Sequence, residues 1–164
     1  MIKKRFLHTI IFALLDGIMG GLSWSLFFAY RKYFIESDKF GYQIPVELDS
    51  NFYLALFLIP IYWIGLYFLA GQYKDVWRKS RISEISQTFT ITVIGVVLLF
   101  FALLLDDAVS SYQSYYKSIL ILFILHFSFT LFVRLLVALW VKFKLKQKLI
   151  GFNTIVVGNN QKSY

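Results

Sequence analysis

The stretch SILILFILHFSFTLFVRLLVALWV, from Ser118 to Val141, decides the fold of this 164-residue chain. At about 1.5 Å of helix rise per residue, it is long enough to cross the ~30 Å hydrocarbon core of a bilayer. Three further apolar stretches reach or approach this length: Phe6–Tyr30, Phe52–Leu69 and Phe89–Leu105. The pattern predicts an all-α membrane protein, with a bundle of four transmembrane helices over residues 1–148.

The composition agrees with a protein surrounded by lipid. The chain is 59% hydrophobic and 16% charged, and its mean hydropathy of +0.66 exceeds what a soluble domain can bury. It contains no cysteine, and His8 and His126 are too far apart to form a histidine metal cluster. Although the net charge is +8, the cations flank apolar runs and form no single basic face, which excludes nucleic acid as a partner.

The distribution of Lys and Arg predicts the orientation of the bundle. Twelve of the 17 lie in the N-terminus, in the segment after the second stretch and in the C-terminal tail. The two other connecting segments hold four, together with six of the nine Asp and Glu. Because Lys and Arg concentrate on the cytoplasmic side, we expect an N-in/C-in topology with both termini in the cytoplasm.

The cytoplasmic segment 72–88 is predicted to lie at the membrane interface, because its cations alternate with apolar residues. The residues expected to contact lipid headgroups are Lys74, Trp77, Arg78, Lys79 and Arg81. Ser80 and Glu84 have the spacing of a helix start, with a serine cap and an acid in the first turn. The third helix is therefore expected to begin near Ser80.

The character of the chain changes after residue 148. Residues 153–157 form a β-branched run that ends at Gly158, a pattern typical of the first strand of a soluble α/β domain. One strand is not stable without partners, so residues 149–164 are interpreted as the start of a truncated domain of a longer protein. A single glycine at this turn does not support nucleotide binding.

Two charged residues fall inside the apolar stretches and are the candidate intramembrane site. Asp16 and Arg134 lie at similar expected depths, so they could form a buried ion pair. The alternative is that Arg134 extends to the cytoplasmic interface and Asp16 is protonated or hydrogen-bonded between helices. The pattern favours the second arrangement. His126, in mid-stretch, is expected to be a neutral imidazole bonded to a neighbouring helix.

Several segments resemble the N-terminal half of bacterial polyprenyl glycosylphosphotransferases, the large monotopic phosphoglycosyltransferases. The similarity covers roughly Pro60 to Lys162. It rests on GQYKDVWRKSRISEI from Gly71, FFALLLDD from Phe100, the pair Tyr115–Tyr116, Arg134, and IGFNTIVVGNN from Ile150.

This resemblance implies a four-helix membrane domain, a small Rossmann-like domain and a C-terminal catalytic domain. That catalytic domain would transfer a sugar 1-phosphate from a UDP-sugar to undecaprenyl phosphate with Mg²⁺, at the bacterial inner membrane, to begin exopolysaccharide or capsule synthesis. The family uses an adjacent Asp-Glu pair, and this chain contains none. No catalytic, cofactor or metal residue is therefore assigned here, and the chain alone is expected to be an inactive membrane anchor.

Two alternatives stay open from the sequence. One is the membrane domain of a nucleotide-sugar dehydratase or epimerase, and the other is a free-standing membrane scaffold. The expected partners are the bilayer, undecaprenyl phosphate, the chain's own C-terminal catalytic domain and other glycosyltransferases of polysaccharide assembly. Close approach of helices is expected at Gly17, Gly20 and Gly21, either between chains or within one bundle.

Overall fold

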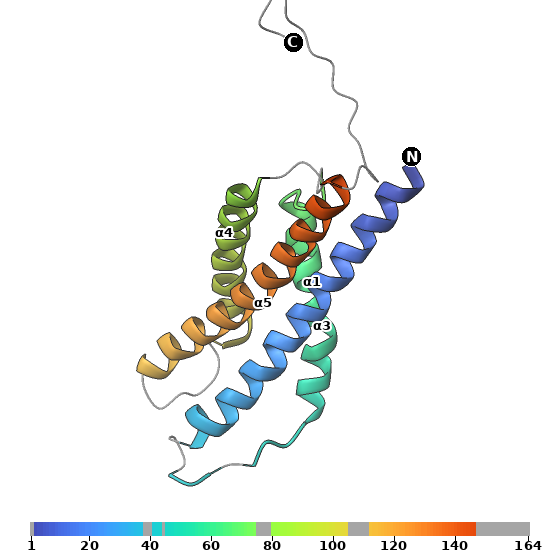
Figure 1. Cartoon of the computed structure of the whole chain (residues 1–164). Helices are drawn as coiled ribbons and strands as arrows, with labels where there is room; N and C mark the ends of the chain where they lie inside the picture. Colours follow the sequence, from blue (N-terminus) through green and yellow to red (C-terminus); the bar gives the residue numbers. More distant parts are fainter. Residues whose placement is uncertain (1, 38–40, 44, 75–79, 105–111, 147–164) are drawn as a thin grey trace, which may run out of the picture.

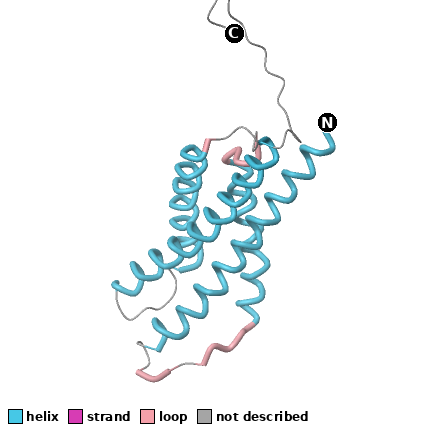
Figure 2. Tube along the Cα trace, in the orientation of Figure 1, coloured by secondary structure: helices cyan, strands magenta, loops and turns pink. Residues whose placement is uncertain are grey.

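The computed structural model describes residues 2–37, 41–43, 45–74, 80–104 and 112–146. These residues form four long helices, two of which continue as short π-helical segments (Figure 1). In chain order the elements are α1 (Ile2–Tyr30), η1 (Arg31–Glu36), α3 (Ser50–Leu69), α4 (Arg81–Leu99), η2 (Phe100–Leu104) and α5 (Tyr112–Lys146). Figure 2 shows helix through the body of the bundle and loops at its ends.

Each predicted apolar stretch corresponds to one helix. The segments long and apolar enough to cross a bilayer are Thr9–Glu36, Ser50–Leu69, Arg81–Ala102 and Gln113–Trp140. The predicted all-α membrane bundle is confirmed for the described residues, and the chain has the build of a multi-pass membrane protein. The strand predicted at 153–157, together with the unit at 149–164, lies outside the described residues.

The third helix differs from its apolar stretch at the N-terminal end. α4 begins at Arg81, eight residues before Phe89, because Ser80 is extended and its Oγ accepts a hydrogen bond from the backbone N–H of Ser83 at 3.2 Å. The expected helix start at Ser80 is confirmed. Residues 81–88 of the predicted interfacial segment 72–88 are therefore helical, since hydropathy marks the apolar stretch and a cap marks the helix.

The helices pack side by side. α1 contacts α3 and α5, while α4 packs mainly against α5. The start of α1, the end of α3, the start of α4 and the end of α5 lie at the same end of the bundle (Figure 1). We call this the basic end, because Lys74, Arg81 and Lys142 belong to it. The two helices that open and close the bundle thus have their outer termini on one side.

The bundle is apolar outside and partly polar inside. In the most apolar window of each helix at most 39% of the residues are buried, and side chains such as Leu14, Phe57 and Phe132 are more than half exposed. The buried polar or charged residues are Asp16, Ser23, Gln72, Thr88, Thr92, Ser118, His126, Thr130 and Arg134. Hydrocarbon solvates an apolar exterior, whereas polar groups inside it need bonded partners, so this distribution suits a bilayer.

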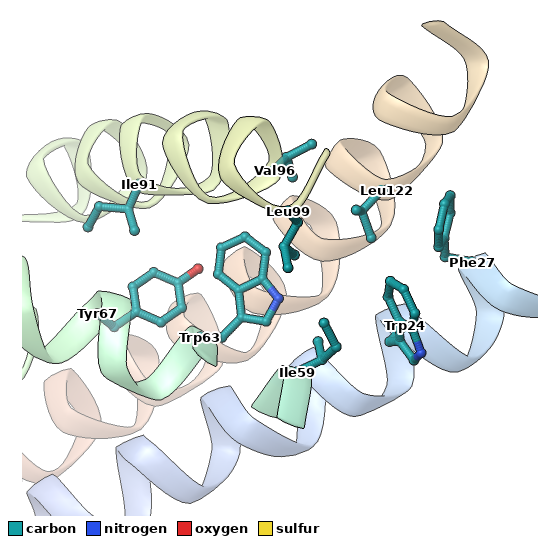
Figure 3. Packing of buried hydrophobic residues seen from close by; sticks show 9 residues of the cluster. All are labelled: Trp24, Phe27, Ile59, Trp63, Tyr67, Ile91, Val96, Leu99 and Leu122. Carbon is teal, nitrogen blue, oxygen red and sulfur yellow. The ribbon is translucent and has the colours of Figure 1, made fainter. Parts of the chain in front are cut away.

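A cluster of buried hydrophobic side chains joins the helices (Figure 3). It consists of Trp24, Phe27, Ile59, Trp63, Tyr67, Ile91, Val96, Leu99 and Leu122. Trp63 is fully buried, and α4 can approach it only because residue 95 is glycine: a Cβ there would lie 2.9 Å from Leu66 Cδ2 and closer still to the Trp63 ring. The Tyr62 hydroxyl donates to the Gly95 carbonyl at 2.7 Å, which fixes this crossing.

Glycines also bring α1 against α3. A Cβ at Gly17 would lie 2.9 Å from Ile64 Cδ1, and one at Gly20 would lie 3.1 Å from Trp63 Cδ1. Of the two arrangements expected for these glycines, the structure contains the one within a single bundle. Small residues replace side-chain bulk with helix-to-helix contact, which is the main attraction between helices in lipid.

Candidate functional site

One face of α5 carries the polar residues that organise the interior. Ser118, Leu122, His126, Thr130 and Arg134 recur every four residues and are all buried. In a helix this spacing places them in one row along one face. Because α5 crosses the whole bundle, its row brings the charge of Arg134 into the interior near the basic end.

Asp16 of α1 pairs with Arg134 through both carboxylate oxygens. Arg134 Nη2 donates to Asp16 Oδ2 at 2.8 Å, and Nε donates to Oδ1 at 3.2 Å. Both side chains are 2% exposed. A two-point contact of this kind is the strong geometry for an arginine and a carboxylate, and it compensates two charges that would each be costly alone.

The remaining nitrogen of the guanidinium binds the other side of the bundle. Arg134 Nη1 lies 3.1 Å from Gln72 Oε1, 3.0 Å from Glu84 Oε1 and 3.2 Å from Thr88 Oγ1. Nη1 has two hydrogens for these three acceptors, so they share them. The Tyr67 ring lies under the guanidinium, 4.2 Å from its carbon to the ring centroid. One side chain therefore joins α1, α3, α4 and the turn after α3.

Tyr73, in the turn after α3, completes the cluster from outside the helices. Its hydroxyl donates to Asp16 Oδ2 at 3.1 Å. Burial raises the pKa of Tyr73 above its ordinary value of 10, the negative charge of Asp16 raises it further, and the positive charge of Arg134 opposes this only in part. The phenol therefore keeps its proton and remains a donor to the carboxylate.

The structure corrects the arrangement favoured from the sequence. Arg134 does not extend to the interface: it is 3% exposed and lies in the pair with Asp16. An isolated arginine in an apolar helix would reach for water. Here acceptors on α1, α4 and the turn after α3 surround it at bonding distance, so the charge is satisfied in place.

Three partners of Arg134 were not identified from the sequence. Glu84 and Thr88 lie four residues apart in the first turns of α4, and Gln72 follows α3 directly. Glu84 was interpreted only as a favourable charge at a helix start. The spacing of Glu84, Thr88 and Thr92 is the signal that one face of this helix is polar, because residues four apart share a face.

His126 forms a second polar centre toward the middle of the bundle. Its Nδ1 lies 3.2 Å from Ser23 Oγ on α1, and its Nε2 lies 3.0 Å from the Tyr67 hydroxyl on α3. Thr130 Oγ1 is 3.4 Å from Nε2, and the imidazole stacks on the Trp63 indole with 3.5 Å between ring centroids. His126 is thus bonded to neighbouring helices as the sequence suggested.

Tyr67 links the two centres. The face of its ring contacts Arg134, and its hydroxyl meets His126. Beyond His126 and Ser23 the interior consists of apolar side chains, among them Phe27 and Leu122, each 1% exposed. The polar groups therefore occupy the half of the bundle nearer the basic end and do not continue through it.

The predicted headgroup residues fall into two groups. Lys74 and Arg81 are exposed at the basic end, beside Ile82, which is 81% exposed. Trp77, Arg78 and Lys79 lie outside the described residues. Exposed cations next to an exposed isoleucine have the character of an interfacial surface, with charge toward headgroups and apolar surface toward the acyl boundary.

The described residues do not fit a magnesium ion. Among them, no three His, Cys, Asp or Glu side chains gather as a metal site would require. The buried carboxylates of Asp16 and Glu84 already accept hydrogen bonds from Arg134. Comparison of the chain with protein families, curated proteins and solved structures finds no match to any of them.

Proposed function

We propose that this chain is the membrane-anchoring domain of a polyprenyl-phosphate sugar phosphotransferase of the bacterial inner membrane. The parent enzyme would move a sugar 1-phosphate from a UDP-sugar to undecaprenyl phosphate and so begin exopolysaccharide or capsule synthesis. Its Mg²⁺ and its catalytic carboxylates would belong to a C-terminal domain, and the present chain would hold that domain at the inner leaflet.

One observation carries this proposal: residues on which the family resemblance rests meet at one site. Gln72, Tyr73 and Glu84 come from the resembling run that begins at Gly71, and each is bonded to the Arg134–Asp16 pair. Arg134 itself belongs to the resembling residues. A motif that the bundle uses to fasten its own basic end suits a platform for another domain.

The arrangement of the polar interior supports an anchor over a transporter. A transport path needs polar or hydrated groups along its whole length. In the described part of the bundle, the polar column ends against Phe27 and Leu122, which are almost completely buried. The buried charges are also paired with each other, so they serve cohesion and are not presented to a passing solute.

The N-in/C-in topology belongs to the same proposal. With it, the basic end faces the cytoplasm, and Lys74, Arg81 and Lys142 lie where anionic headgroups attract them. Fusing alkaline phosphatase within residues 41–49 should give an active reporter, whereas a fusion after Lys146 should be inactive. The reverse pattern would place the basic end outside and remove the proposed role as a cytoplasmic platform.

The function is tested by reading the open reading frame beyond Tyr164. An Asp-Glu pair after a re-entrant amphipathic helix supports the phosphotransferase. A glycine-rich dinucleotide fingerprint would indicate a nucleotide-sugar dehydratase or epimerase instead, and a stop codon would indicate a free-standing scaffold. A second test incubates membranes containing this chain alone with radiolabelled UDP-sugar. Transfer of label to undecaprenyl phosphate there would contradict the assignment of catalysis to another domain.

A further inference from the structure

A groove runs between α1 and α3 on the surface of the bundle. Its volume is about 310 Å³. The residues that line it are Leu14, Gly17, Ile18, Gly21, Leu56, Pro60 and Ile64. All of these are apolar, so the groove presents no side chain that could hydrogen-bond a ligand.

The groove exists because its floor lacks side chains. Gly17 and Gly21 lie one helical turn apart on α1 and face Pro60 on α3. A Cβ at Gly21 would lie 3.6 Å from both Leu56 Cδ1 and Pro60 Cγ. The two backbones thus approach closely, and the longer side chains of Leu14, Ile18, Leu56 and Ile64 rise on either side of the contact.

The groove lies at the depth of the bilayer interior. Pro60 is the eleventh of the 20 residues of α3. From Leu14 to Gly21 the groove extends along α1 for roughly 10 Å at the helical rise. Leu14 and Ile18 at its rim are 58% and 55% exposed. It therefore opens sideways into the hydrocarbon and not toward either aqueous phase.

We propose that this groove binds one acyl chain of a bilayer phospholipid. An empty groove would forfeit the dispersion contacts of its walls, and a flexible hydrocarbon chain restores them. No polar group is present to select a headgroup, so the chain type that surrounds the bundle fills the groove. This inference goes beyond the proposed function and does not depend on it.

A second copy of the bundle is a poorer occupant. Partner helices use glycines to bring backbones together. Here Gly17 already faces Ile64 of the same chain at the closest approach that a Cβ would permit, and Gly21 faces Leu56 and Pro60. The small-residue face is therefore used within one chain, and what remains beside it is a narrow channel bordered by branched side chains.

The test uses the full chain in vesicles of phosphatidylcholine and phosphatidylglycerol that contain a phosphatidylcholine with a diazirine at mid-chain. After illumination, adducts are mapped by peptide mass spectrometry. Adducts should concentrate on Leu14, Ile18 and Leu56 relative to Leu26 and Phe57, which are exposed elsewhere. Equal labelling of both groups would contradict the proposal, because it would show only the lipid that surrounds every exposed residue.

Filling the groove provides the matched variant. Ile18→Trp should remove most of the excess labelling at Leu14 and Leu56, while Leu26→Trp, at a similarly exposed position of α1, should leave it unchanged. Circular dichroism checks the fold of each variant, and Ile18→Phe replaces Ile18→Trp if that variant does not fold. Persistence of the excess labelling in the filled variant would overturn the proposal.

Two further arms distinguish other occupants. A photoreactive polyprenol replaces the phosphatidylcholine in the first, and chain-to-chain adducts are sought in the second. Preferential labelling of the groove by the polyprenol over the acyl chain would contradict an acyl occupant, as would adducts between two chains at Ile18. Labelling by the acyl probe alone supports it.

Discussion

Arg134 Nη2 lies 2.8 Å from Asp16 Oδ2, although 118 residues separate the two in the chain. This contact joins the first and last helices, and the other donors of Arg134 reach α4 and the turn after α3. In a medium without water, such a network is stable only when each member keeps its partner. The basic end of the bundle is therefore expected to depend on this one guanidinium.

Removing the guanidinium should strongly destabilise the bundle. Arg134→Gln leaves Asp16 and Glu84 buried without their cation, and breaking a buried pair costs about 3–5 kcal/mol. The unfolding free energy, measured by denaturation in mixed micelles, should fall by this order. Lys142→Gln is the control, because it removes the same charge from an exposed position of the same helix.

The pair is isolated by a double-mutant cycle. Asp16→Asn alone should destabilise the protein, and its effect should shrink when Arg134 is already glutamine, since the two groups share one contact. If both single variants unfold at the wild-type denaturant concentration, the ion pair has no structural role.

Alkaline pH should reveal the hydrogen bond of Tyr73. The folded state raises the pKa of this phenol above 10, so its contribution to stability is complete below pH 10. Above that pH the unfolded state releases the proton that the folded state retains, and stability falls as pH rises. Unfolding followed from pH 9 to pH 11 should show a steeper loss for wild type than for Tyr73→Phe. Parallel curves would disprove the shift.

Gly95 should tolerate no side chain. Gly95→Ala places a methyl group against Leu66 and Trp63 in the core, and overpacking of this kind costs about 1–3 kcal/mol. Gly65→Ala is the matched control on α3, because a Cβ there meets nothing within 4 Å. Melting temperatures in detergent should drop for the first variant and hold or rise for the second. Equal values for both would contradict the close crossing of α3 and α4.

Replacing His126 should loosen the centre of the bundle. His126→Leu keeps an apolar side chain of similar size but leaves the hydroxyls of Ser23 and Tyr67 without the imidazole. The expected cost is about 1–3 kcal/mol, the penalty of buried polar groups that lose a partner. Ser128→Ala, on an exposed face of α5, controls for a polar deletion in the same helix. An undiminished melting temperature for His126→Leu would show that the stacked imidazole is dispensable.

Local features of the fold were predictable from the sequence. The four crossings follow from run length, because the thickness of hydrocarbon imposes the same minimum on every helix wherever its neighbours lie. The start of α4 was likewise predictable, since the Ser80 side chain caps a backbone group only three residues away. A reader of residues 80–84 has all the atoms that decide this boundary.

The partners of Arg134 were decided by the tertiary structure. Hydropathy makes a helix apolar without stating which face turns inward, and a favoured route to the interface was available to an arginine at this depth. Only the rotation and register of α1 and α4 against α5 bring Asp16, Glu84 and Thr88 within bonding distance. The sequence by itself thus determined how many helices cross the membrane, because that is a property of each segment. The packing of those helices determined which charges meet, because that depends on all of them at once.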